Sequence, residues 1–218
     1  MTLPRIANYA LPAGSELPAA RVPWEVDPSR AALLIHDMQN YFVNAFGPGG
    51  SPIEDVIANI VALRRRCDEL AMPVFYSAQP GHQDPAERGL QTDFWGPGMT
   101  SAPEHREIVA ALTPDPWHRR LTKWRYSAFR RTPLEAELQA DRRDQLIVTG
   151  IYASIGCALT AADAFMSDIQ PFFVADAVAD FSRERHDLAV SFVAERCGVA
   201  MTTAHVLAAL QPQGAWAR

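Results

Sequence analysis

The chain has 218 residues, of which 48% are hydrophobic and 21% charged. This is the composition of an ordinary globular protein, and it excludes intrinsic disorder, collagen and coiled coil. The formal net charge is −5, and a mildly acidic chain without a basic tract is poorly suited to binding nucleic acid. We therefore expect a single domain over residues 1–218 with no nucleic-acid partner.

The sequence contains no segment typical of membrane insertion or export. Nothing approaches the roughly 18 unbroken apolar residues of a membrane span, and no charged stretch leads into an apolar one at the N-terminus. The cysteines are odd in number, and neither they nor the six histidines show metal-ligand spacing. We expect a cytoplasmic protein without membrane association, metal or cofactor. The cysteines are Cys67, Cys157 and Cys197.

The use of basic residues is uneven, because nineteen arginines accompany a single lysine, Lys123. Arginine replaces lysine readily at solvated positions, but not where a compact ammonium with a tunable pKa is needed. Lys123 is therefore either a lysine without a special role or a residue of a site into which a guanidinium does not fit.

The first part of the chain predicts an arm, two strands and a helix. Residues 1–29 contain five prolines, which favour an extended N-terminal arm. The apolar run over 30–37 is typical of a buried strand in a parallel sheet. A loop rich in glycine follows over 40–52, and apolar residues at helical spacing predict a helix over 54–70. Residues 73–78 predict the second strand.

The middle of the chain predicts a long loop followed by short elements. The loop covers 79–103, and a loop of this length in a compact domain is usually functional. A short strand is expected near 120–123. Pro133 predicts the start of a helix, with Thr132 as its N-cap.

The last part of the chain predicts three more strands alternating with helices. Strands are expected over 145–150, 171–175 and 199–202, with a helix over 155–167 and a short helix at the end. A further helix begins at the N-cap Ser182 and is stopped by Gly198.

This alternation predicts an α/β fold, a three-layer sandwich with a mainly parallel central sheet flanked by helices. In such sheets the ligand binds outside the carboxyl ends of the strands. Those ends bring together an acid, an amide, a cation and a phenol. The residues expected there are His36, Asp37, Gln79, Lys123, Gly150, Ile151 and Tyr152.

Asp37 is the strongest candidate for a catalytic carboxylate, because acids are rarely buried unless they are paired or functional. The alternative is a strand-end aspartate that caps a turn. Lys123 is a candidate partner for Asp37, and an ammonium nearby lowers the pKa of a carboxyl while burial raises it. A general acid must hold a proton near pH 7. A bound anionic substrate favours that protonated form.

The other candidates are binding residues. Arg88 in the long loop is suited to clamping a substrate carboxylate, although a lone loop arginine is more often a surface charge. Gln79 is either a substrate contact or a turn residue, and Tyr152 is either a polar contact or a buried tyrosine with a satisfied hydroxyl. Aromatic rings are candidates for the walls of an apolar pocket, or else for core packing. They are Phe42, Phe94 and Trp95.

Over nearly its whole length the sequence resembles the isochorismatase-like hydrolase family. LTKWRYSAF is long and very specific, and HDMQ and VADAVADFS are specific in combination. The resemblance implies a parallel sheet with Rossmann-like topology, usually assembled as a homodimer. The stretches that carry it are AALLIHDMQNYFV (31–43), SAQP (77–80), DFWGPGM (93–99), LTKWRYSAF (121–129), GIYASIGC (150–157), DAFMSDIQPFFVADAVADFS (163–182) and the closing MTT.

The family contains cysteine hydrolases, whose cysteine lies seven residues before the aspartate of a helical motif. Here that aspartate is Asp163, so the nucleophile position holds Gly156. Cys157 is one residue late, and one helical residue turns a side chain by about 100°. We therefore interpret Cys157 as a buried structural thiol. The missing Cβ of Gly156 is expected to leave room for the ligand.

Glycine at this position resembles the vinyl-ether hydrolases of the family, which act on isochorismate or on 2-amino-2-deoxyisochorismate. By this resemblance Asp37 is the general acid, and Lys123 orients it and binds a substrate oxygen. Phe42 and Trp95 line the pocket, and a cis peptide precedes Tyr152. The substrate-binding residues are then Gln79, Arg88, Tyr152 and Gly156. Ser154 is a departure, since both branches commonly have histidine there; we favour a structural or outer-shell exchange.

Four hypotheses remain open. The first is an isochorismatase of siderophore or related metabolism, and the second is the hydrolase of the amino analogue, as in phenazine synthesis. The third is a non-catalytic partner of a carrier protein, which the retention of Asp37 and Lys123 disfavours. The fourth is a cysteine hydrolase, which thiol alkylation would inactivate.

Overall fold

The computed structural model describes residues 3–211, and its centre is a six-stranded sheet in which every strand pair is parallel. The strand order is β3-β2-β1-β4-β5-β6. The predicted α/β fold with a parallel sheet is thereby confirmed. The strands are β1 Ala31–His36, β2 Val74–Ala78, β3 Arg119–Thr122, β4 Gln145–Ile151, β5 Gln170–Ala179 and β6 Val199–Met201.

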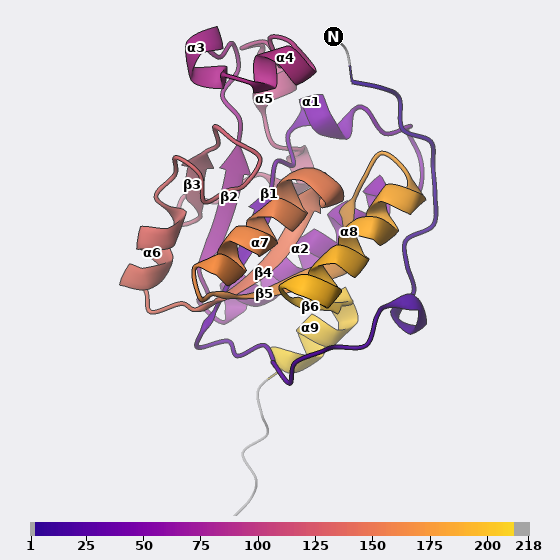
Figure 1. The fold of residues 1–218 in the computed structure, drawn as a ribbon, viewed down its shortest axis with the longest axis vertical. Coiled ribbons are helices and arrows are strands. Elements are labelled where there is room, and N and C mark those ends of the chain that lie inside the picture. Colours follow the sequence, from indigo (N-terminus) through magenta and orange to yellow (C-terminus); the bar gives the residue numbers. More distant parts are fainter. Residues whose placement is uncertain (1–2, 212–218) are drawn as a thin grey trace, which may run out of the picture.

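Helices cover both faces of the sheet, which gives the three layers of the predicted sandwich. Figure 1 shows α7 and α8 side by side in front of the sheet, with α2 behind it. Two apolar clusters, one on each face, hold the layers together. The longer helices are α2 Ile53–Glu69, α6 Leu134–Ala140, α7 Ala158–Met166, α8 Arg183–Arg196 and α9 Thr203–Ala209.

Strand β1 illustrates how the sequence builds both clusters. All six of its residues are buried, and successive side chains point to opposite faces. Leu33 and Ile35 pack with α2, whereas Ala32 and Leu34 pack with α7. Helix α7 contributes the small residues Ala158, Ala161 and Ala164 to this second cluster.

Short helices lie where the sequence predicts only loop. Helix α1 Asn40–Val43 lies within the predicted loop 40–52, and α3 Pro85–Arg88 and α4 Gln91–Trp95 lie within 79–103. Helices of four or five residues are too short to show apolar periodicity. The capping signal of α3 is nevertheless in the sequence, since Asp84 accepts a hydrogen bond from the Ala86 amide at 2.8 Å. The remaining short elements are α5 Pro103–Arg106 and the 3₁₀ turns Gly14–Glu16 and Ala110–Leu112.

Element ends differ from the predictions by a few residues. Helix α6 begins at Leu134 rather than at Pro133, and Thr132 Oγ1 accepts from the Leu134 amide at 3.2 Å. The helix predicted over 155–167 opens instead as a π turn, Ala153–Cys157, ahead of α7. Strand β5 extends well past the predicted 171–175. Its pairing with β4 is interrupted after Phe173 and resumes in a shifted register at Val178.

The ends of α8 are as predicted. Ser182 Oγ accepts a hydrogen bond from the Arg185 amide at 3.3 Å, which satisfies one of the free donors of the first turn. The Gly198 amide donates to the Val193 carbonyl oxygen at 2.8 Å beyond the last turn.

The N-terminal arm follows the surface of the domain and reaches the carboxyl edge of the sheet. Ile6 is buried and forms a parallel bridge with Phe46. The Tyr9 hydroxyl accepts from the Asp180 amide at 2.8 Å. The single domain over 1–218 with an arm over 1–29 stays a prediction, and residues 1–2 and 212–218 lie outside the described part.

Among residues 3–211, no helix is both long enough and apolar enough to cross a membrane.

Candidate active site

A cavity lies at the carboxyl edge of the sheet, near the point where the strand order reverses. The chain winds outward from β1 in one direction and from β4 in the other, so the loops that follow these strands diverge and leave a crevice. All eight predicted site residues line this cavity, although their individual roles remain predictions. They are Asp37, Phe42, Gln79, Arg88, Trp95, Lys123, Tyr152 and Gly156.

Asp37 is the residue directly after β1, and the surrounding strands fix its carboxylate. Its backbone has a φ of 50°, a left-handed conformation that costs about 1–3 kcal/mol outside glycine and is often found at functional sites. Oδ1 accepts from Ser77 Oγ at 2.7 Å. Oδ2 lies 2.9 Å from Lys123 Nζ and 3.3 Å from Gln79 Nε2. Strand ends β1, β2 and β3 thus converge on one carboxylate.

Lys123 is buried at the end of β3, and acceptors surround its ammonium. Besides Asp37, Nζ donates to the carbonyl oxygens of Arg125 at 2.8 Å and Tyr126 at 3.1 Å. Three acceptors match the three N–H groups of an ammonium. A substrate oxygen that binds Lys123 must therefore share or replace one of these three contacts. The sequence alone does not reveal this restriction.

The ion pair determines the protonation of Asp37. Burial raises the pKa of the carboxyl, but the Lys123 ammonium and the hydrogen bonds from Lys123 and Ser77 outweigh burial. The net effect holds the pKa of Asp37 below its usual range. In this state of the site Asp37 is a carboxylate at neutral pH.

Arg88 lies in α3 and is only 4% exposed, so it is not a surface charge. Nε donates to the Gly96 carbonyl oxygen at 2.8 Å, and Nη1 donates to Gln83 Oε1 at 2.6 Å. Gly98, with a φ of 77°, allows this placement, because a Cβ there would lie 2.7 Å from Nη1. Within residues 3–211, no carboxylate pairs with this guanidinium. A buried cation without a counterion makes the cavity suited to an anion.

Aromatic rings form one wall of the cavity. Tyr152 stacks on Phe181 with ring centroids 4.1 Å apart, and Trp95 is parallel to Phe181 at 6.3 Å. The Tyr152 hydroxyl donates to the Phe42 carbonyl oxygen at 3.1 Å, so its proton already has an acceptor. Phe94 is 73% exposed and does not line the cavity, because α4 turns it outward. The prediction that Phe94 forms part of the pocket wall is therefore wrong.

Gly156 reaches the cavity, but the space beside its α-carbon is not open. A Cβ at this position would lie 2.0 Å from His36 Cε1. The prediction that the missing Cβ leaves room for the ligand is therefore wrong, since the imidazole of His36 fills that space. Cys157, one residue later, points away into the apolar cluster between sheet and α7, and burial raises its pKa.

The segment after β4 has one feature that the resemblance implies and one that departs from it. The peptide bond between Ile151 and Tyr152 is cis, as the resemblance implies. Ser154 does not line the cavity, and its amide donates to Asp180 Oδ2.

Sequence reasoning missed several residues that shape the site. Gln39 clamps the backbone of Gln79: its Oε1 accepts from the Gln79 amide at 2.8 Å, and its Nε2 donates to the Gln79 carbonyl oxygen at 2.9 Å. Tyr126 accepts from Trp95 Nε1 at 2.7 Å. Both lie in stretches that carry the resemblance, and this was the available signal. Leu3 of the arm also lines the cavity.

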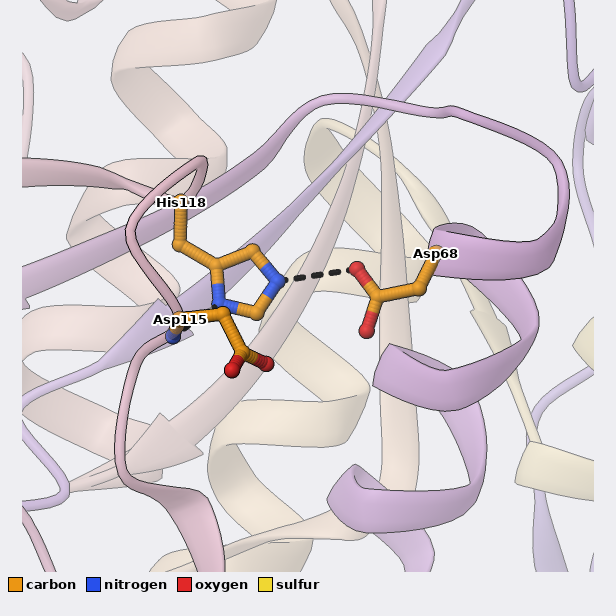
Figure 2. A group of neighbouring side chains, drawn as sticks. All are labelled: Asp68, Asp115 and His118. Carbon is orange, nitrogen blue, oxygen red and sulfur yellow. Dashed lines mark hydrogen bonds and ion pairs between the residues drawn. The ribbon is translucent and has the colours of Figure 1, made fainter.

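A second polar cluster lies away from this cavity (Figure 2). Asp68, Asp115 and His118 offer ligand atoms within 4.8 Å of one another. His118 Nδ1 accepts from the Asp115 amide at 2.9 Å, and Nε2 donates to Asp68 Oδ1 at 2.8 Å. Both ring nitrogens are therefore engaged within the protein, as expected of a structural tie between α2 and the segment before β3. The absence of metal stays a prediction.

A doubly wound parallel sheet, a buried carboxylate–ammonium pair at its switch point and, within residues 3–211, a buried arginine without a carboxylate partner are features of an α/β enzyme. The chain matches the family model described as the isochorismatase domain over residues 31–205. It belongs to the isochorismatase family, and it is a hydrolase.

Relatives of two kinds are similar to nearly the whole chain. The isochorismatase of Bacillus subtilis is 52% identical over 97% of this chain and 68% of its own length. The phenazine biosynthesis protein PhzD of Pseudomonas fluorescens is 47% identical over 94% of this chain and 98% of its own length. A solved structure of a cysteine hydrolase from Pseudomonas syringae pv. phaseolicola superposes with a TM-score of 0.79 at 23% identity, covering 88% of this chain and 97% of that one. At this identity the likeness concerns the fold alone.

Proposed function

We propose that the chain hydrolyses the enolpyruvyl ether of isochorismate, giving pyruvate and 2,3-dihydro-2,3-dihydroxybenzoate. The observation that carries the proposal is the buried Asp37–Lys123 pair, 2.9 Å apart, in a cavity where Arg88 has no counterion among the residues that the structure describes. A dicarboxylate substrate supplies the negative charge that this cavity lacks. The similarity to an isochorismatase over almost the whole chain supports the same substrate.

In the proposed mechanism Asp37 is a general acid. It transfers a proton to the terminal methylene carbon of the vinyl ether, which leaves an oxocarbenium ion at the adjacent carbon. Water adds to that carbon and returns a proton to the Asp37 carboxylate. The resulting hemiketal passes its hydroxyl proton to the ring oxygen as the bond from the carbon to that oxygen breaks. The products are pyruvate and the ring alcohol. No step needs a nucleophilic side chain, which accords with glycine at position 156.

The protonation state of Asp37 is the main demand of this mechanism. Without substrate, the Lys123 ammonium keeps the pKa of Asp37 below its usual range. A bound anion opposes the carboxylate form and competes for the ammonium, so both effects raise that pKa. Substrate binding thereby favours the protonated acid that the first step consumes.

Arg88 and the polar residues at the strand ends bind the substrate in this proposal. The free face of the Arg88 guanidinium takes a substrate carboxylate as a charge-assisted pair. Gln79 contacts a polar substituent, Gly156 contributes its backbone amide, and Tyr152 contributes its ring. Phe42 and Trp95 complete the apolar wall.

The second candidate is 2-amino-2-deoxyisochorismate, which the same chemistry converts to trans-2,3-dihydro-3-hydroxyanthranilate. The similarity of the chain to a phenazine biosynthesis protein, at 47% identity over 94% of its residues, supports this substrate. The isochorismate reaction belongs to siderophore-type metabolism and the amino reaction to phenazine-type metabolism. We further propose that the protein is cytoplasmic and acts as a homodimer.

The test is pyruvate release from purified protein given the two substrates side by side. A specificity ratio of tenfold or more, about 1.4 kcal/mol of differential transition-state binding, identifies the substrate. Release of pyruvate from neither substrate would refute the vinyl-ether mechanism and favour an amidase-type hydrolase.

A further inference from the structure

His36 packs against two glycines, Gly150 within β4 and Gly156 in the π turn that follows this strand. Gly150 has a φ of 107°, and a Cβ there would lie 2.2 Å from the carbonyl oxygen of His36. Gly156 faces the ring of the same residue, with a virtual Cβ 2.0 Å from Cε1, 2.7 Å from Nε2 and 2.8 Å from Nδ1. The backbone of His36 thus excludes a side chain at 150, and its imidazole excludes one at 156.

The imidazole has little freedom to move aside. His36 is 1% exposed, and both ring nitrogens face backbone carbonyl oxygens. Nδ1 lies 2.9 Å from the oxygen of Ile151, and Nε2 lies 3.2 Å from that of Tyr126. Burial lowers the pKa of His36 to about 4, so the ring is uncharged near neutral pH. An uncharged ring donates one hydrogen bond, and the shorter contact indicates that Nδ1 is the donor.

These contacts connect His36 to the proposed catalytic pair. The oxygen of Tyr126 that faces Nε2 also accepts from Lys123 Nζ at 3.1 Å. Asp37 is the next residue along the chain, with Oδ1 3.8 Å from Nδ1. One ring therefore contacts the backbone before Tyr152, the backbone that holds Lys123, and the α-carbon of Gly156.

We propose that His36 is a positioning residue that determines which reaction the site performs. Its ring occupies the space that a nucleophilic side chain at 156 would need, packs against the Gly156 backbone, and donates through Nδ1 to the Ile151 carbonyl oxygen at the peptide before Tyr152. The site is thereby confined to acid catalysis by Asp37. This inference rests on the proposed function and extends it to a residue that lines the cavity beside Asp37.

The first test is a double-mutant cycle on pyruvate release. Gly156→Ala forces the new methyl group onto the ring, so we expect kcat to fall at least tenfold. In the double variant His36→Ala/Gly156→Ala the overlap is gone, and we expect it to exceed Gly156→Ala alone in kcat by at least fivefold. Losses that multiply independently would overturn the proposal, because neighbours that compete for one space must couple.

A second pair of variants separates positioning from mere packing. His36→Asn retains a donor at the place of Nδ1, whereas His36→Leu fills a similar volume without one. We expect Asn to keep kcat within about fivefold of the parent and Leu to lower kcat more than tenfold, with KM changing less than kcat in both. Equal kcat for Asn, Leu and the parent would overturn the positioning role.

Thermal melting of the same proteins keeps this inference distinct from the proposed function. If the unmodified protein releases no pyruvate from either substrate, the proposed function fails and the role of His36 in it fails too. The steric part is still measured, since His36→Ala must then relieve the loss of melting temperature caused by Gly156→Ala. Independent shifts in melting temperature would show that the ring and Gly156 do not compete for space.

Discussion

Two buried histidines of this protein each contact an aspartate, yet only one of the two regions has the features of a catalytic site. At His118 both ring nitrogens are engaged, and the Asp68 carboxylate is 25% exposed (Figure 2). At His36 the neighbouring Asp37 side chain is 6% exposed, pairs with Lys123 and lines a cavity. A second cation, Arg88, lines the same cavity and pairs with no carboxylate of the described residues 3–211. Both regions bury a histidine beside an aspartate. Only the His36 region also has a cavity lined by a buried arginine that no carboxylate of residues 3–211 neutralises.

Exchanging each aspartate for asparagine tests this comparison with the largest expected effect. Asp37→Asn keeps the shape but removes the acidic proton, so we expect kcat for pyruvate release to fall by about 10²–10⁴-fold, the usual contribution of a general acid. Substrate binding should persist, because Arg88 and Lys123 remain. Isothermal titration with a non-hydrolysable analogue measures this directly.

Asp68→Asn is the matched control. Asparagine still offers an oxygen to His118, so we expect activity within about twofold of the parent and a melting temperature lower by about 2–4 °C, the effect of roughly 1 kcal/mol in a domain of this size. A comparable loss of kcat at both positions would mean that burial beside histidine, and not the cavity charge, is the relevant property.

Lys123→Arg tests whether the lone lysine is required as an ammonium. Arginine keeps the charge but is larger and planar, and Lys123 is only 2% exposed with three acceptors placed for an ammonium. We expect kcat to fall about 10–100-fold while the protein remains folded by circular dichroism. Full activity of Lys123→Arg would mean that Lys123 has no role that requires an ammonium.

Arg88→Met tests the unpaired charge itself. Methionine fills the buried space but cannot bind a carboxylate. A hydrogen bond to a charged group contributes about 1.5–3 kcal/mol, so we expect KM to rise roughly 10–150-fold with a smaller change in kcat. Steady-state kinetics separate the two parameters. An unchanged KM would show that the substrate anion binds elsewhere.

The pH dependence sharpens the assignment of Asp37. Its pKa in the free protein is lowered, so the fraction that carries a proton falls about tenfold for each pH unit above that pKa. Since the first step consumes this proton, kcat/KM should decline as pH rises from about 6 to 8. The kcat profile should decline at higher pH, because bound substrate raises the pKa. A kcat/KM that increases over this range would contradict the general-acid role.

The sequence was sufficient to predict eight of the residues that line the cavity, but not Leu3, Tyr126 or the contacts among the lining residues. Parallel strands end at one edge, so the predicted strands that stop at Asp37, Gln79 and Lys123 must bring those residues together. By contrast, the fit between His36 and Gly156 depends on distances across 120 positions of the chain. No local pattern encodes the three acceptors around the ammonium, and the capping signal of α3 does not reveal that this helix buries Arg88.

Cys157→Ala is expected to have the smallest effect, and it separates this site from that of a cysteine hydrolase. Cys157 directly follows the residue that takes the nucleophile position, but its side chain is fully buried, with Sγ 3.8 Å from the Thr149 carbonyl oxygen. Burial raises the pKa of this thiol well above its ordinary value, so the reactive thiolate is scarce. We expect Cys157→Ala to retain activity within about twofold. Iodoacetamide should leave the folded protein active and label Cys157 only after denaturation. Inactivation of the folded parent together with resistance of the variant would instead identify Cys157 as a nucleophile. Position 157, and not position 156, would then carry the chemistry of a cysteine hydrolase.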